Sequence, residues 1–87
     1  MRIAAPTLDP DEREPAGVAG TDRYRPADRV WVFRGGAWRA GIVEVASARA
    51  ATVTYRPTGA GGTAVDTMVA RYLLPRTEPD PLLDSID

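Results

Sequence analysis

The chain contains neither cysteine nor histidine among its 87 residues. The lack of cysteine excludes disulfides and thiolate ligands, and the lack of histidine removes the imidazole ligand that many metal sites use. Lysine is absent too, so the only general bases left are carboxylates. The central region has three of them, Asp28, Glu44 and Asp66, on separate strands or turns and in no recognisable pairing. We therefore expect no catalytic residue, no metal site and no cofactor.

Long apolar runs are also missing. No stretch of 18 or more apolar residues could span a membrane, and Pro6, Asp9 and Pro10 interrupt the part of the chain where a signal peptide would need an apolar core. We accordingly expect a cytoplasmic protein that does not contact a membrane. The basic residues are all arginine, and asparagine and glutamine are absent. This bias is typical of a GC-rich genome, so the use of arginine in place of lysine carries little functional information.

Charge is unevenly distributed along the chain. Residues 1–22 carry two arginines and five acids, residues 23–76 carry nine arginines and three acids, and residues 77–87 carry four acids. The first and last of these segments are also rich in proline and show no helical or strand period. We therefore predict a flexible acidic N-terminal arm at residues 1–23, a folded basic domain at residues 24–76 and a flexible acidic C-terminal tail at residues 77–87.

The folded domain is organised around the stretch from Val30 to Val45. Two alternating apolar segments, 29–34 and 37–46, flank Gly35-Gly36, a dipeptide that accepts the positive φ angles of a tight hairpin. Three further segments are typical of strands, 51–56, 63–69 and 73–74, and residues 70–72 suit a single 3₁₀ turn. Gly41 is predicted to mark a bend or a close backbone approach. The pattern favours an all-β fold, a five-stranded antiparallel sheet closed into a small barrel.

The order and spacing of four short motifs resemble SH3-like barrels of the Tudor and Agenet kind. Those families read Asp-x-Val-x-Ala, Trp-x-x-Ala-x-Val, Val-x-Tyr and a final Val-x-x-x-Leu-x-x-Arg. The matching segments of this chain are 28–32, 36–43, 53–55 and 65–76, so that the resemblance covers about residues 27–76. Similar openings occur in KOW motifs and in the C-terminal barrels of integrases, which bind nucleic acid.

The resemblance implies a binding domain whose aromatic rim can form a cage for a methylated lysine or arginine. Cation–π attraction would supply roughly 0.5–2 kcal/mol for each well-placed ring. The candidate partner-binding residues are Trp31, Phe33, Trp38 and Tyr55, with Trp38 the first choice for an exposed contact. The chain has Arg39 where Tudor domains often place a cage tyrosine, and the same rings also suit the apolar cover of a small barrel. We expect a non-catalytic adaptor that recognises a protein partner.

Two other functions stay open. Arginines interleaved with aromatic residues are typical of sheets that track a phosphate backbone, and the candidates for nucleic-acid binding are Arg34, Arg39, Arg49 and Arg56. Ordinary solvated arginines on strand faces would give the same pattern, and the acidic ends would compete with phosphate for this surface. The domain could also be a structural subunit or a homodimer. The sequence does not decide the oligomeric state.

Overall fold

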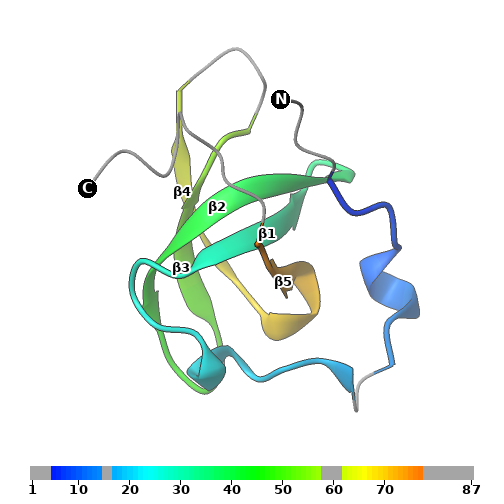
Figure 1. The fold of residues 1–87 in the computed structure, drawn as a ribbon, viewed down its shortest axis with the longest axis horizontal. Helices are drawn as coiled ribbons and strands as arrows, with labels where there is room; N and C mark the ends of the chain where they lie inside the picture. Colours follow the sequence, from blue (N-terminus) through cyan, green and yellow to red (C-terminus); the bar gives the residue numbers. More distant parts are fainter. Residues whose placement is uncertain (1–4, 15–16, 58–61, 78–87) are drawn as a thin grey trace.

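The computed structural model describes residues 5–14, 17–57 and 62–77. Within them the chain forms an antiparallel sheet of five strands in the order β4-β3-β2-β1-β5, without an α-helix (Figure 1). The strands are β1 Arg29–Arg34, β2 Ala37–Ala46, β3 Ala51–Tyr55, β4 Ala64–Met68 and β5 Leu73–Pro75. Three 3₁₀ turns accompany them: η1 Pro10–Glu12, η3 Thr21–Arg23 and η4 Ala70–Tyr72. The predicted small all-β domain of five antiparallel strands is confirmed, with strand ends within two residues of those expected. Among the described residues, no helix has the length and apolar character needed to span a membrane.

The hairpin between β1 and β2 turns at the predicted glycine pair. Gly35 and Gly36 have φ angles of 62° and 81°, and Arg34 pairs with Ala37 across the turn. Both angles lie in the left-handed region that glycine adopts without steric cost, as a two-residue hairpin loop with matching twist requires. The hairpin prediction is confirmed, and β5 then pairs with the other edge of β1.

Gly41 lies where β2 passes close to its neighbours. A Cβ at this position would lie 2.9 Å from Val32 Cγ2 and 3.1 Å from the carbonyl oxygen of Thr54. The register with β3 shifts between Val43 and Val45, which marks a bulge. The predicted close backbone approach at Gly41 is therefore confirmed.

The sheet is strongly curled. Arg34 at the end of β1 forms an ion pair of 2.7 Å with Asp66 on β4, although these strands are separated by β2 and β3. In a flat sheet the two strands would lie about 14 Å apart and the two side chains would stand parallel. Their contact requires the core face to be concave. The described residues do not pair β4 with β5, so the observed architecture is a curled sheet with two ends.

The concave face holds the main core. Its largest fully buried side chains are Leu73, Val30, Val32, Val43 and Val53, to which Tyr24, Ala51, Tyr55 and Met68 add. Each buried aliphatic side chain of this size contributes roughly 1.5–3 kcal/mol. Arg76 is also buried and donates from Nε to the carbonyl of Val30 and from Nη2 to the carbonyl of Gly41. This arginine therefore ties the end of the last strand to β1 and β2.

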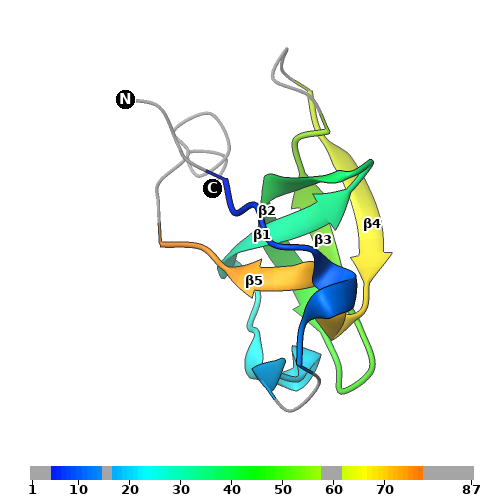
Figure 2. The same cartoon turned by 90° about the vertical axis from the view of Figure 1, so that its right-hand side faces the viewer.

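The described part of the predicted N-terminal arm lies against the sheet. Figures 1 and 2 show it passing along β1 and β5 before it turns towards the first strand. Pro10 and Thr21 are fully buried, and the hydroxyl of Thr21 donates to the carbonyl of Ser47. Residues 5–14 and 17–23 are thus part of the packed structure, whereas the flexibility expected of this arm stays a prediction. Most of the C-terminal tail, residues 78–87, lies outside the described residues.

Candidate functional site

A second apolar cluster lies on the opposite, outer face of the sheet. Trp31, Trp38 and Ala40 form its buried part, and Phe33, Ile42 and Leu74 pack against them. Cross-strand pairing brings these residues together, because Trp31 lies opposite both Ala40 and Leu74, and Phe33 lies opposite Trp38. Strand alternation points them away from the core valines. We call Trp31, Phe33, Trp38 and Leu74 the outer aromatic face.

The rings of this face are in contact with one another. Phe33 and Trp38 meet edge to face with their centroids 5.2 Å apart, and Phe33 stacks on Tyr72 at 6.4 Å. Both distances lie in the range that favours aromatic pairs. Tyr72 was not among the candidate residues of the sequence, since the 3₁₀ turn that carries it shows no strand period. The structure thus places a fourth ring, which also packs against the main core, beside the outer aromatic face.

Tyr55 lies on the other side of the sheet. It pairs with Gly41, shares the concave face with Val43 and Val53, and is only 5% exposed. The structure therefore brings Trp31, Phe33 and Trp38 together and does not bring Tyr55 to them. Side chains alternate between the two faces of a sheet, and in β3 Tyr55 lies on the same face as the core residues Ala51 and Val53.

Trp31 and Trp38 are each only 5% exposed, although they lie on the outer face. The expectation that Trp38 would be an exposed contact is therefore not met. The neighbouring sheet residues Phe33, Ile42 and Leu74 pack against both tryptophans, and the N-terminal arm contacts Trp38, whose indole N–H donates to the carbonyl of Leu8 at 2.9 Å. Two residues later Pro10 is fully buried, while Leu8 itself is 42% exposed. A segment of the same chain therefore occupies this face. We call residues 8–13 the docked segment.

Arg13 fixes the other end of the docked segment. Its Nη1 donates to the carbonyls of Arg71 at 2.7 Å, Leu73 at 2.8 Å and Ala70 at 3.3 Å. Two of these carbonyls lie in the 3₁₀ turn η4 and the third begins β5, and the carbonyl of Ala70 also accepts from the backbone N–H of Leu73. Hydrogen bonds from a charged donor are stronger than neutral ones. We call the three carbonyls the carbonyl cage. Sequence reasoning missed it, and the only signal was one arginine in an otherwise acidic segment.

The docked segment has internal order as well. The carboxylate of Asp9 accepts from the backbone N–H of Asp11 at 2.9 Å, and Pro10 begins the short turn η1. Asparagine and aspartate form such turns readily, and proline suits the first position of a helical turn because it has no N–H to satisfy there. An exposed ion pair of 3.5 Å joins Asp11 to Arg71. Exposed pairs of this kind contribute at most about 1 kcal/mol.

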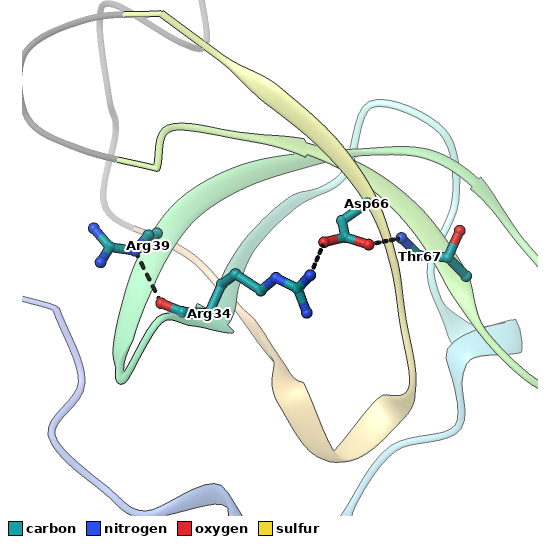
Figure 3. A network of polar contacts seen from close by, with 4 residues as sticks. All are labelled: Arg34, Arg39, Asp66 and Thr67. Atoms are coloured by element: carbon teal, nitrogen blue, oxygen red, sulfur yellow. Dashed lines mark hydrogen bonds and ion pairs between the residues drawn. The ribbon is translucent and has the colours of Figure 1, made fainter.

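The four candidate nucleic-acid residues do not form one patch. Figure 3 shows that Arg34 contacts Asp66, whose carboxylate also accepts the N–H of Thr67, and that Arg39 Nε donates to the carbonyl of Arg34. Arg56 follows β3 and its N–H bonds to the carbonyl of Ala40, near Arg39. Arg49 lies beyond the opposite end of β2, in the connection to β3. The structure thus places the main chain of Arg34, Arg39 and Arg56 at one end of the β1–β2 hairpin and Arg49 at the other.

An open cavity of about 630 Å³ lies at the start of β1. Arg23, Tyr24, Asp28, Arg29 and Arg76 are among its lining residues, so the cavity carries charges of both signs. Burial raises the pKa of the Tyr24 phenol, an effect that Arg13 opposes and Asp28 reinforces. Among the described residues, no group of acidic side chains has the geometry of a metal site. The cavity is therefore a less defined candidate than the outer aromatic face.

Comparison with protein-family models, with curated proteins and with solved structures gives no match to this chain. Its function is therefore inferred from the geometry of its own residues.

Proposed function

We propose that this domain is an SH3-like barrel of the Tudor type that acts as a non-catalytic adaptor and binds a peptide segment of a partner protein on its outer aromatic face. Support for the barrel comes from the curl of the sheet, the tight first hairpin and the 3₁₀ turn before the last strand. The observation that carries the binding proposal is the docked segment itself, because it already lies on that face as a ligand would.

The contacts of the docked segment suit peptide binding. The Trp38 indole donates to a main-chain carbonyl, which every peptide offers, whereas the buried proline and the carbonyl cage select for particular side chains. Tryptophan and tyrosine are enriched in protein interfaces because they combine a large apolar area with a hydrogen-bonding group. The outer aromatic face and the neighbouring carbonyl cage therefore combine a contact that accepts any sequence with contacts that select particular side chains.

Nucleic-acid binding is the second candidate, favoured by the grouping of Arg34, Arg39 and Arg56 near the hairpin. It ranks lower because the guanidinium group of Arg34 already pairs with Asp66 at 2.7 Å. Under this alternative, affinity would fall steeply as salt rises, since each neutralised phosphate releases counterions. A titration of DNA and RNA oligonucleotides with increasing salt distinguishes it from peptide binding.

Capture of partners from native lysate, with and without nuclease, tests the proposed function. The bait is the full chain in three forms: wild type, Phe33→Ala and Val65→Ala. Phe33 is partly buried on the outer aromatic face, whereas Val65 is 65% exposed on the same side of the sheet but on β4. We expect Phe33→Ala to lose a protein that both wild type and Val65→Ala retain after nuclease treatment.

Two results contradict the proposal. Either the three baits capture the same proteins, or the captured material disappears with nuclease. Trp38→Ala is a poorer test, because removing a buried tryptophan ring typically costs about 3–5 kcal/mol and would unfold a small domain. Circular dichroism of each bait confirms that a lost partner does not reflect a lost fold.

A further inference from the structure

The docked segment is held at three points that depend on sequence spacing. Pro10 is fully buried, Asp9 caps the turn that Pro10 begins, and Arg13 enters the carbonyl cage one turn later. The backbone N–H of Arg13 also bonds to the carbonyl of Pro10 at 3.4 Å, so the turn sets the distance between the proline and the guanidinium group. The selective part of the segment therefore has the form Asp-Pro-x-x-Arg.

We propose that the docked segment is a built-in ligand of the outer aromatic face, and that the partner is another protein carrying an Asp-Pro-x-x-Arg turn that replaces it. This inference rests on the proposed function and names the chemistry of its partner. The arginine enters the carbonyl cage, the proline fills the site of Pro10, and the residue before the aspartate accepts from the indole of Trp38. The intramolecular segment competes for the same contacts and so sets a threshold for partner binding.

The C-terminal tail does not meet this requirement. Asp80-Pro81 is the only other Asp-Pro pair in the sequence, and the residue three positions after its proline is Asp84. A carboxylate at that position would be repelled by the three carbonyl oxygens that hold Arg13. Charge therefore excludes the tail as an occupant and requires a cation in the partner.

Release of the docked segment would expose the outer aromatic face to solvent. Trp31 and Trp38 are each 5% exposed with the segment in place, and Trp38 would lose its hydrogen bond to Leu8 on release. Contiguous aromatic surface of this kind is rarely left open in a soluble monomer and marks interaction sites where it occurs. Binding of a partner segment in place of the docked one would cover the rings again.

The test measures binding of a fluorescent peptide with the sequence of residues 5–14 to the full-length protein. Wild type and Arg13→Ala are compared, because the substitution removes the three hydrogen bonds that hold this end of the docked segment. We expect the peptide to bind Arg13→Ala at least tenfold more tightly than wild type. A matched peptide in which the arginine is replaced by alanine should bind at least tenfold more weakly. The indole N–H resonance of Trp38 should shift on release and return on peptide binding.

A second variant that removes a weaker contact of the docked segment controls for loss of the fold in Arg13→Ala. Asp9 is exposed and its contribution is the cap of η1, so Asp9→Ala should loosen the segment without altering the sheet. We expect its affinity for the peptide to lie between those of wild type and Arg13→Ala.

Equal binding of both peptides, or equal binding to all three folded proteins, would overturn the built-in ligand. If light scattering shows that Arg13→Ala forms a dimer whose fraction rises with concentration, the segment of a second copy occupies the face. That result also overturns the proposal. If neither peptide binds but Phe33→Ala still loses a partner in the lysate capture, the built-in ligand is refuted and the proposed function stands.

Discussion

Replacement of Gly41 by alanine tests the packing that shapes the sheet. The added methyl group would lie 2.9 Å from Val32 Cγ2, 3.1 Å from the carbonyl oxygen of Thr54 and 3.2 Å from Tyr55 Cβ. None of these atoms moves easily, since valine is stiff at χ1 and the other two atoms belong to or adjoin the main chain of β3. The same residue also offers its carbonyl to the buried guanidinium of Arg76. Any shift of β2 would therefore disturb that bond as well.

The expected magnitude follows from two opposing effects. An extra methyl group in a packed site usually costs about 1–3 kcal/mol, whereas exchange of glycine for alanine returns about 0.4–1 kcal/mol by restricting the unfolded chain. We expect a net loss of roughly 1–2 kcal/mol in the free energy of unfolding. With a urea dependence near 1 kcal/mol per molar for a domain of this size, the midpoint should fall by roughly 1–2 M.

Equilibrium unfolding in urea, followed by tryptophan fluorescence, measures this loss. Gly17→Ala is the matched control, because a Cβ at that position meets nothing within 4 Å. We expect Gly17→Ala to leave stability unchanged or slightly raised. Equal midpoints for the two variants would refute the close approach of β2 to its neighbours.

Three further predictions concern one backbone angle, one buried phenol and one ion pair. Ala27 has a φ angle of 74°, so Ala27→Gly should relieve left-handed strain and raise the free energy of unfolding by roughly 0.5–1 kcal/mol, measured by thermal melting. Burial raises the pKa of Tyr24 in the folded state above its unfolded value. The contribution of the neutral phenol to the free energy of unfolding is therefore fully present below about pH 10 and is lost as pH rises through the folded pKa. The urea midpoint of the wild type should fall above about pH 10, and that of Tyr24→Phe should fall less. The Arg34–Asp66 pair is 55% and 29% exposed, so a double-mutant cycle with Arg34→Ala and Asp66→Ala should give a coupling below about 1 kcal/mol that shrinks with added salt.

The strands were predictable because their signals are local. Alternation of apolar residues within 29–34 and 37–46 gave boundaries identical to those of β1 and β2, and Gly35-Gly36 specified the turn between them. Gly41 was recognisable as a glycine inside an apolar strand. Closure of the sheet into a barrel stays a prediction, and the curl that is observed depends on contacts such as Arg34 with Asp66, which are 32 positions apart in sequence.

The face on which each ring lies depends on register between strands. Trp31, Phe33 and Trp38 come together because β1 and β2 share a hairpin whose turn sets the pairing. Tyr55 reaches the opposite face because it pairs with Gly41 across β2 and β3, whose connection of four residues leaves the register open in the sequence. Aromatic density in the sequence therefore predicted an apolar surface but could not assign its members to one side.

The arm shows why net charge is a poor guide to whether a segment docks. Its excess of acids led to the prediction of a flexible segment, which stays a prediction. In the described part the acids contribute little to docking, since Asp9 caps a turn and Asp11 forms an exposed pair. The contacts that hold the arm are those of one arginine with three carbonyls, one buried proline and one main-chain carbonyl on Trp38. Carbonyls carry no residue-type signature, and these lie 57 to 60 positions away from Arg13. The sequence feature that marks the docked segment is thus Arg13, the one cation among residues 8–13, three positions after Pro10.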